Sequence, residues 1–430
     1  MRAASANSPL PSSSRNPRPM SSPDQRKVSL PAELTEGFGQ TQTEMLAVSE
    51  KQEELFIGIP REITLQEKRV ALVPSGVNNL TSRGHRVIVE TGAGKHSAFT
   101  DHEFSENGAE IAYSAQEVYQ KAKIILKVAP PTLEEIDLMQ PNTILISPLQ
   151  LPIITAEYLF RLKHKRIIAL AMAYLMDEEG SFPLVRIMSE MAGISAIQTA
   201  AELLSTNQGG PGVLLGGISG VPSAKVVILG GGVVAEYATR AAIGMGAEVR
   251  IFDDNIHKLM RLQNSVGRQL YTSAINPVYL RRELVTAEVA IGAIHAEDGR
   301  APVVVSEDMV RSMRPGAVII DISIDQGGCF ATSELTTLEK PTFRKHDVIH
   351  YCVPNIASRI GRTASIAVSN ILVPMLLRAE GAHNFERFLF QQRGMRHGIY
   401  TFRGCLTNQY LGRRFEMRCT DIDLLMTSGM

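Results

Sequence analysis

One stretch constrains this chain more than any other, the run "VVILGGGVVAEYATRAAIGMGAEVRIFDD" over residues 226–254. Its branched apolar residues predict a strand, which passes directly into "GGGVVA" at 230–235 and so fits the pattern G-x-G-x-x-G/A. Gly230 permits a tight turn, Gly232 lets the backbone approach a pyrophosphate, and Ala235 keeps the following helix close to the sheet. The free N–H groups of that helix would point at the phosphates. The stretch therefore predicts a Rossmann-type dinucleotide-binding unit.

An acidic residue sits where a ribose-binding carboxylate belongs in such a unit. Asp253 ends the next expected strand, eighteen residues beyond Ala235, and Asp254 follows it. A carboxylate there accepts bonds from both ribose hydroxyls and repels a 2′-phosphate, which favours NAD over NADP. The alternative is a structural unit of the same fold that binds no nucleotide.

Length and composition bound the rest of the molecule. A chain of 430 residues is too long to fold around a single small core, so we expect two domains. Lys plus Arg and Asp plus Glu are both 44, so the net charge is +0 and no basic field recruits nucleic acid or anionic lipid. The four cysteines lack CxxC spacing, which argues against a zinc site or disulfide framework and fits a reducing cytoplasm. No uninterrupted apolar run is long enough to predict a membrane span.

The first 54 residues differ in composition from the rest of the chain. The opening "MRAASANSPLPSSSRNPRPMSSPDQRK" is rich in Ser, Pro and Arg and poor in large apolar residues, so we expect a disordered extension. Its arginines also resemble those of an organellar transit peptide, although the early prolines oppose the necessary helix. The segment "TQTEMLAVSEKQEEL" is expected to form a short helix, with a partner subunit as one candidate for its packing.

From residue 55 the pattern alternates between strand and helix. The expected strands are short, β-branched and apolar on both faces, as in a covered parallel sheet; examples are "LFIGIPRE", "HRVIVETGAG", "IILKVA", "TILISPL" and "RIIALAMAY". A second alternating unit starts at "AKVVILGGG". We therefore expect an α/β fold of two Rossmann-like domains with mostly parallel sheets around a cleft. The expected substrate domain covers 55–182 and 361–430, and the expected NAD-binding domain covers 183–360.

Several further motifs occur in a family-like order and spacing. They are "IGIPREITLQEKRVALVPSGV", "VIVETGAG", "MSEMAG", "GVLLGGISGVPSAKVVILGGGVV", "DISIDQGGC" and "VIHYCVPNI". With them the chain resembles the alanine dehydrogenase and transhydrogenase NAD-domain family over about residues 56–411. The resemblance implies oxidative deamination of L-alanine with NAD to pyruvate, ammonia and NADH.

The resemblance also implies roles for particular residues. Arg69 in "EKRVAL" would hold the substrate carboxylate, as a planar fork suited to a bidentate partner. Asp325 in "DISIDQGG" would be the catalytic acid, with Asp321 as the alternative acid and a turn-capping role as the alternative function. The implied cofactor positions are Ser189, Gly230, Gly232, Val233, Val234, Ala235, Asp253, Lys258, Ala293, Ile294, His295, the segment from Ile322 to Asp325, Val353, Asn355 and Ile356.

Two positions depart from the family pattern. The second lysine of "VKVKEP" is Ala129 here, and the catalytic histidine of "YLHLA" is Gln150. Alanine cannot bind a carboxylate, and glutamine can orient a substrate but cannot shuttle protons near neutral pH. Lys127, two residues before Ala129, could recover part of the missing charge because residues i and i+2 of a strand share a face. His96 and His350 are the other candidate substitutes, although a histidine within an apolar strand is more often a satisfied interior residue.

The departures leave other functions open. One alternative is the NAD-binding component of a transhydrogenase, and another is an NAD(H)-binding sensor without catalysis. A lysine-pathway dehydrogenase is a fourth option with no feature in its favour. The resemblance further implies a homo-oligomer, a hexamer in this family.

Overall fold

The computed structural model describes residues 54–149, 154–295, 299–379 and 385–427. The expected disordered extension and its short helix lie outside the described residues, apart from Glu54 and Leu55, and so does Gln150. Residues 52–430 form one unit that contains two β-sheets.

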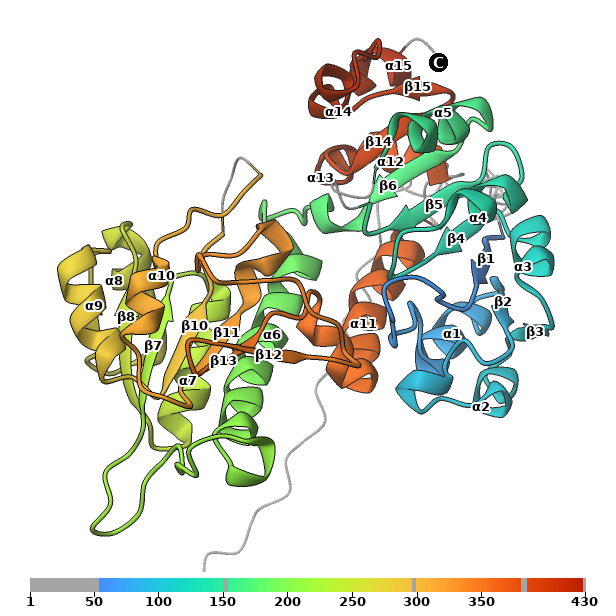
Figure 1. Cartoon of the computed structure of the whole chain (residues 1–430). Coiled ribbons are helices and arrows are strands. Elements are labelled where there is room, and N and C mark those ends of the chain that lie inside the picture. The colour runs from blue at the N-terminus through green and yellow to red at the C-terminus, as the bar shows by residue number, and fades with distance from the viewer. Residues whose placement is uncertain (1–53, 150–153, 296–298, 380–384, 428–430) are drawn as a thin grey trace, which may run out of the picture. The chain divides into compact units, whose positions relative to one another are not determined.

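The first sheet has eight strands in the order β15-β14-β6-β5-β4-β1-β2-β3 (Figure 1). Strands β1 to β6 are parallel, β14 runs antiparallel to β6, and β15 runs antiparallel to β14. The bounds are β1 Phe56–Ile59, β2 Arg86–Glu90, β3 Glu110–Ala112, β4 Ile124–Leu126, β5 Ile144–Ser147, β6 Ile168–Ala171, β14 Ile399–Phe402 and β15 Cys405–Leu406.

Helices cover both faces of this sheet, which explains why its central strands are apolar throughout. Apolar residues of α1, α2, α11 and α12 pack on one face, and those of α3, α4 and α5 pack on the other. Thr100 and Thr132 begin α2 and α4 with capping boxes, so local sequence starts these helices. The bounds are α1 Pro74–Thr81, η2 Lys95–Ser97, α2 Asp101–Glu106, α3 Ala115–Lys121, α4 Leu133–Leu138, α5 Ala156–His164 and η3 Met172–Tyr174.

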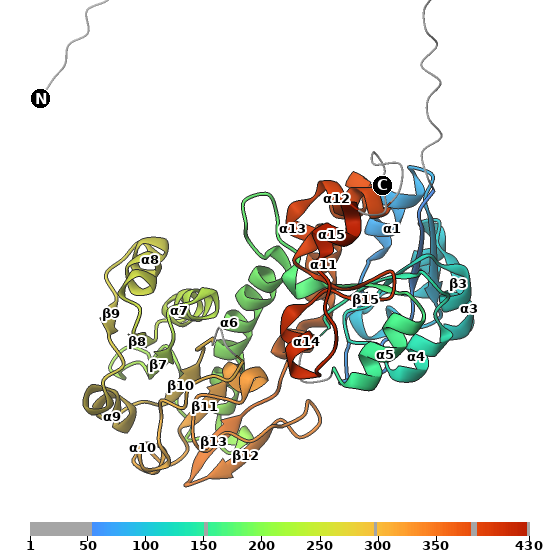
Figure 2. The same ribbon diagram turned by 90° about the horizontal axis from the view of Figure 1, so that it is seen from above.

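The second sheet has seven strands in the order β12-β13-β11-β10-β7-β8-β9, and only β12 is antiparallel. Figure 2 shows α6, α7 and α8 on one of its faces and α9 and α10 on the other. The bounds are β7 Lys225–Leu229, α7 Val233–Gly244, β8 Glu248–Phe252, α8 Ile256–Val266, β9 Tyr271–Ser273, α9 Pro277–Val285, β10 Val289–Gly292, α10 Glu307–Arg311, β11 Val318–Asp321, η5 Ile322–Gln326, β12 Thr342–Lys345 and β13 Val348–Tyr351.

Both sheets place their parallel strands in the spatial order 3-2-1-4-5-6 of a doubly wound fold. The strand order reverses between β1 and β4 in the first sheet and between β7 and β10 in the second. Ligands of such sheets bind beyond the carboxyl ends of the strands at this reversal. The α/β prediction with mostly parallel sheets is confirmed, and its topology directs attention to these two places.

Two long helices run between the parts of the chain that build the sheets. Helix α6, Pro183–Leu203, follows the first sheet, and α11, Gly361–Ala379, follows the short helix η6, Ile356–Ile360. An added Cβ at Gly193 of α6 would lie 2.4 Å from the carbonyl oxygen of Val234 in α7, so the two helices approach closely. The two helices begin at the domain boundaries expected from the sequence, and that division stays a prediction.

The segment Ile356–Ala379 has a mean hydropathy of 1.5, which makes it the one helix of the described residues long and apolar enough to cross a membrane. No such run was expected from the sequence. In the structure half of this segment is buried, and α11 packs its apolar side chains into the core of the first sheet. It is therefore a core helix.

Short elements at sheet edges and in the last part of the chain were missed from the sequence. They include β3, β12, β14 and β15, together with η4 Thr206–Gln208, α12 Phe385–Gln391, α13 Arg393–Arg396, α14 Gln409–Arg414 and α15 Ile422–Thr427. These strands have two to four residues, and, unlike the predicted strands, none of them is a continuous run of aliphatic residues.

Candidate active site

The glycine-rich turn lies at the strand reversal of the second sheet. Gly230 directly follows β7 and has a φ of +115°, and an added Cβ would lie 2.4 Å from the carbonyl oxygen of Ala293. Only glycine fits there, because the conformation disfavours a side chain and the space excludes one. Gly232 caps the N-terminus of α7, and an added Cβ there would meet nothing within 4 Å. Ala235 is fully buried and packs in the core beneath.

A pocket of about 200 Å³ opens beside this turn. It contains six of the residues that the resemblance assigned to the cofactor, namely Gly232, Asp253, Lys258, Ala293, Ile294 and His295. Asp254, which the sequence placed beside Asp253, lines the pocket too, and three further lining residues were missed, namely Ile275, Pro302 and Val304. No sequence motif singles these three out, because they come from neighbouring loops that only the fold brings together.

Asp253 stabilises the turn as well as facing the pocket. Its Oδ2 accepts a hydrogen bond of 2.6 Å from the backbone N–H of Gly231, and its Oδ1 accepts one of 2.7 Å from Asn255. Asp254 accepts a bond of 3.0 Å from the backbone N–H of Ile275. A carboxylate has about four lone-pair sites, so Asp253 retains acceptor capacity for ribose hydroxyls. The open glycine and the two acids fit a dinucleotide without a 2′-phosphate.

Other predicted cofactor positions are not among the residues that line the pocket. Ser189 on α6, Val233 and Val234 in the first turn of α7, and Ile322 in η5 are half-buried. Val353 and Ile356 are each 4% exposed and belong to the core of the second sheet, so their side chains face away from solvent. The cofactor roles of these residues stay predictions.

The carboxyl end of β1 leads to a buried ion pair between Arg69 and Glu67. The Nε of Arg69 donates to Glu67 Oε1 at 2.7 Å, and its Nη2 donates to Oε2 at 2.6 Å. The Nη2 also donates to the carbonyl oxygen of Val128 at 3.3 Å, and the Nη1 contacts the sulfur of Met188 at 3.0 Å. The bidentate partner of Arg69 in the structure is therefore Glu67, whereas the sequence had predicted the substrate carboxylate as that partner. Glu67 lies within the motif "EKRVAL" but had been given no role.

Asp325 lies in η5, just after β11 ends. Its side chain reaches solvent, yet the surrounding protein desolvates the carboxyl group enough to raise its pKa to about 6. A hydrogen bond from the backbone of Asn355 and the charge of Arg69 both oppose this rise, so Asp325 and Arg69 lie close enough to interact. The carboxyl group therefore titrates near neutrality and can exchange a proton there.

The alternative acid, Asp321, is buried and serves the loop around it. Its carboxylate accepts bonds from the backbone N–H groups of Ser323 and Cys329, at 3.0 and 2.9 Å, and from the Ser333 hydroxyl at 2.6 Å. It is 1% exposed. This saturated position shows a structural role for Asp321 and leaves Asp325 as the acid that solvent can reach.

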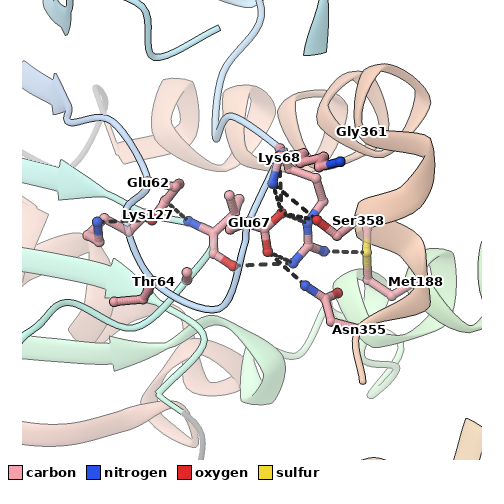
Figure 3. A network of polar contacts seen from close by, with 12 residues as sticks. Glu62, Thr64, Glu67, Lys68, Lys127, Met188, Asn355, Ser358 and Gly361 are labelled. Atoms are coloured by element: carbon pink, nitrogen blue, oxygen red, sulfur yellow. Dashed lines mark hydrogen bonds and ion pairs between the residues drawn. The ribbon is translucent and has the colours of Figure 1, made fainter. Parts of the chain in front are cut away.

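Glu67 is the centre of the polar network around the ion pair (Figure 3). It accepts a bond of 2.7 Å from the Asn355 side chain and one of 2.9 Å from the Ser358 hydroxyl. Asn355 adopts a left-handed conformation with a φ of +56°. These contacts bring residues that follow β13 against the loop that follows β1.

Lys127 is not a free cation at this site. It is 0% exposed, and its Nζ lies 2.9 Å from both Glu62 Oε2 and Glu135 Oε1. The Tyr119 hydroxyl also donates to Glu135, at 2.7 Å. This geometry corrects the expectation that the lysine stem reaches a substrate, because withdrawing Nζ would leave two buried carboxylates unpaired.

The described residues show no replacement for the lysine and the histidine of the family pattern. Ala129 is 1% exposed, and Gln150 lies outside the described residues. His350 is fully buried: its Nδ1 lies 3.0 Å from the Val348 carbonyl oxygen and its Nε2 lies 2.8 Å from the Thr332 hydroxyl. Burial lowers the pKa of His350 and keeps the imidazole neutral. It is the satisfied interior histidine that the sequence favoured.

His96 is exposed in η2, and in the part of the chain that the structure describes no hydrogen bond or ion pair joins it to Asp325 or Arg69. The described residues also contain no group of three or more His, Cys, Asp or Glu side chains that could hold a metal ion. All four cysteines are free thiols.

The two doubly wound sheets, the dinucleotide pocket and the adjacent acid and arginine define a nucleotide-binding α/β protein with features of a dehydrogenase. Family models for the N-terminal and C-terminal domains of alanine dehydrogenase/PNT match residues 58–192 and 196–409. The chain belongs to this alanine dehydrogenase/PNT family.

Individual relatives that are similar to this chain are named alanine dehydrogenases. The chain is 37% identical to alanine dehydrogenase of Methanococcus maripaludis over 85% of its own length and 98% of the relative's. It is 39% identical to alanine dehydrogenase of Bacillus subtilis, covering 84% and 94%. A solved L-alanine dehydrogenase superposes with a TM-score of 0.79 at 35% identity, covering 84% of this chain and 99% of that chain.

Proposed function

We propose that this protein is an NAD-dependent dehydrogenase that deaminates L-alanine, or a related small amino acid, to a 2-oxo acid and ammonia in a reversible reaction. The observation that carries the proposal is the proximity of Arg69 and Asp325, since the charge of one perturbs the pKa of the other. A cation for the substrate carboxylate thus stands beside a group that exchanges protons near neutrality. The likeness to alanine dehydrogenases over most of the chain supports the choice of substrate.

The residues around the glycine turn would hold the cofactor. The pyrophosphate would lie over Gly232 and the first N–H groups of α7, and Asp253 would accept bonds from the ribose hydroxyls. Bound NAD supplies the hydride acceptor for the hydrogen on the substrate Cα. The remaining proposed contacts are Ser189, Gly230, Val233, Val234, Ala235, Lys258, Ala293, Ile294, His295, Ile322, Val353, Asn355 and Ile356.

On the substrate side, Arg69 would orient the carboxylate through its Nη1, since its Nε and Nη2 already bind Glu67. Loss of hydride from Cα, with loss of a proton from nitrogen, leaves an imino acid. Water then adds to the imino carbon, and an Oδ of Asp325 accepts the proton that this water loses. Asp325 then returns this proton to the nitrogen and accepts the hydroxyl proton as the C–N bond breaks, so that ammonia leaves and the 2-oxo acid forms. The ionised form of Asp325 is required for this step.

A second candidate is an NAD(H)-binding sensor without catalysis. It is favoured by Ala129, which replaces the lysine of the family pattern, and by Lys127, whose ammonium group is held between two buried glutamates. The sensor would bind NADH tightly and turn over no amino acid. A transhydrogenase-like component is the third possibility and would require an NADP-binding partner.

The deciding experiment is NADH oxidation by the purified protein with ammonia and a panel of 2-oxo acids. We expect turnover of pyruvate, and a loss of about 100- to 10,000-fold in kcat for Asp325→Asn, the usual contribution of a proton-transferring group. In the direction of alanine oxidation, kcat should fall as pH drops through about 6, because protonated Asp325 cannot accept a proton. NADH binding without turnover of any 2-oxo acid would instead establish the sensor.

We further propose a cytoplasmic homo-oligomer. The four free cysteines suit a reducing compartment. The loop before β7 exposes Leu214, Ile218 and Val221 at 63%, 66% and 55%. These side chains offer an apolar surface that a second copy of the chain would cover.

A further inference from the structure

The Glu67 carboxylate has an unusually complete set of hydrogen-bond donors. Besides the guanidinium of Arg69, it accepts from the backbone N–H groups of Lys68 and Arg69, at 3.0 and 2.9 Å. The side chains of Asn355 and Ser358 provide two more bonds. The side chain of Glu67 is 1% exposed, so these donors replace water around a buried anion. Burial alone would raise its pKa, but Arg69 and the hydrogen bonds hold the pKa below its ordinary value.

This arrangement limits what Arg69 can offer to a ligand. Glu67 occupies one whole edge of the guanidinium, formed by Nε and Nη2, and the carbonyl of Val128 takes the remaining bond of Nη2. Only Nη1 is left, and its neighbour is the thioether sulfur of Met188, a weak acceptor. An incoming carboxylate would therefore contact Arg69 through one nitrogen.

Asn355 joins this pair to the acid. Its backbone lies close enough to the carboxyl group of Asp325 to oppose the rise in the pKa of that group, and its side-chain amide donates to Glu67 Oε2 at 2.7 Å. Asn355 has a left-handed backbone conformation, with a φ of +56°, in which its backbone faces Asp325 and its side-chain amide faces Glu67. Asparagine tolerates this conformation better than most residues. A single residue thus contacts both Asp325 and the partner of Arg69, and Figure 3 shows its side chain pointing at Glu67.

We propose that Glu67 and Asn355 are positioning residues that fix Arg69 relative to Asp325 and restrict Arg69 to a one-armed contact, through Nη1, with the substrate carboxylate. This inference rests on the proposed dehydrogenase function and adds two residues and a binding mode to it. Neither residue needs to touch the reacting atoms, since each acts through its neighbour.

Substitutions of Glu67 and Asn355 should shift the pKa of Asp325 in opposite directions. A purely structural role of the two residues would not produce opposite shifts. Glu67→Gln removes the carboxylate that neutralises Arg69, so the charge of Arg69 should stabilise ionised Asp325 more strongly. The acidic limb of the kcat–pH profile should therefore move to lower pH. Asn355→Gly keeps the left-handed backbone but releases it from Glu67. The backbone of residue 355 is then held less firmly beside Asp325 and stabilises the ionised carboxyl group less, so the acidic limb should move to higher pH. KM for alanine should rise about 10- to 100-fold in Glu67→Gln, the scale of losing a hydrogen bond between charged groups.

Glu283→Gln is the matched control, because Glu283 also pairs with cations, Lys225 and Arg250, but lies on α9 of the second sheet. Glu283→Gln should leave both the KM for alanine and the acidic limb of the kcat–pH profile unchanged. Glu67→Asp keeps the charge on a shorter stem, and it should raise KM without moving the limb as Glu67→Gln does. This second variant serves if Glu67→Gln does not fold. Unchanged KM in the Glu67 variants, or limbs that move in the same direction in Glu67→Gln and Asn355→Gly, would overturn the proposal.

Hydrogen exchange provides a readout that does not need turnover. The amides of Lys68 and Arg69 donate to Glu67, so Asn355→Gly should accelerate exchange in the segment 61–70 at least about tenfold, while Glu283→Gln should not. If the wild-type protein turns over no 2-oxo acid, the proposed function is wrong. Amide hydrogen exchange in the segment 61–70 then tests by itself whether Asn355 holds the loop of Glu67 and Arg69 in place. Unchanged exchange in Asn355→Gly would contradict this positioning role.

Discussion

Lys127 illustrates how a charged residue can be misread at the scale of a single position. Its place in "ILKVAPP" suggested a cation beside a substrate, but Glu62 and Glu135 enclose it completely. The group of one ammonium and two carboxylates is neutral when Glu62 carries a proton. Burial accordingly raises the pKa of Glu62 to about 7, although Lys127 and the N–H of Val128 oppose the rise.

Removing this lysine should chiefly destabilise the fold. Lys127→Met leaves two buried carboxylates without their cation, and breaking such a pair costs about 3–5 kcal/mol in the free energy of unfolding. Urea unfolding measures this loss. Lys121→Met is the matched control, because Lys121 also pairs with two glutamates, Glu110 and Glu117, but is 42% exposed. We expect a loss of about 0–1 kcal/mol there. Equal losses in the two variants would contradict the buried cluster.

The Glu62 carboxyl group should make stability depend on pH. Its pKa in the folded protein, about 7, lies above the ordinary value of 4.5, so the unfolded chain binds fewer protons between these values. The contribution of Glu62 to the free energy of unfolding therefore falls as pH rises from 4.5 to 7. Glu62→Gln removes this contribution, and its stability relative to the wild type should increase across that window. Thermal unfolding at pH 5 and pH 8 checks the sign, and a constant difference would refute the assignment.

At the scale of the element, the turn between β7 and α7 uses its glycines for two different purposes. Gly230 is required by the chain itself, because its φ is positive and a Cβ would strike the Ala293 carbonyl. Gly232 has an ordinary φ and open space around its Cα, so the fold would accept a side chain there. The motif assigned the turn to Gly230 and the approach to the pyrophosphate to Gly232, and the positive φ of Gly230 and the open space at Gly232 agree with that division.

These glycines should therefore respond differently to alanine. Gly230→Ala should lower the melting temperature and weaken NADH binding, because the turn itself must shift. Gly232→Ala should leave the melting temperature unchanged and still raise the Kd for NADH, because the methyl group enters the space proposed for the pyrophosphate. Thermal unfolding and NADH fluorescence titration of both variants distinguish the two. A Gly232→Ala protein with an unaltered Kd would place the pyrophosphate elsewhere.

At the scale of the whole molecule, the carboxyl ends of strands in both sheets place the candidate groups. The first sheet supplies Arg69 and Glu67 after β1, and the second supplies Asp325 after β11 and Asn355 after β13. Residues 288 positions apart thus meet through one hydrogen bond. No local pattern contains such a contact.

The exposed loop before β7 leads to a prediction about assembly. Ile218 and Val221 pair with each other in an isolated bridge and expose their side chains to solvent. Ile218→Glu should not disturb the core, but it should place a charge in the proposed contact between copies. Light scattering after size exclusion should then show a smaller assembly, approaching the 47.0 kDa protomer. Tyr113→Glu, at a residue 85% exposed on the segment after β3, is the control. An unchanged mass for Ile218→Glu would remove the loop from the interface.

The amino-acid sequence was sufficient to predict the fold class, the glycine turn, Asp253 and the candidate roles of Arg69 and Asp325. The fold class and the glycine turn rest on short-range rules: apolar runs form covered strands, and a positive φ at a crowded turn requires glycine. The roles of Arg69 and Asp325 came from the resemblance to the family and stay predictions. Three features emerged only from the folded chain: Glu67 is the partner of Arg69, Lys127 is enclosed, and Asn355 contacts both Glu67 and Asp325. The physical reason is that pairing and desolvation depend on which groups folding brings within hydrogen-bonding distance, and neighbours in space are not neighbours in sequence.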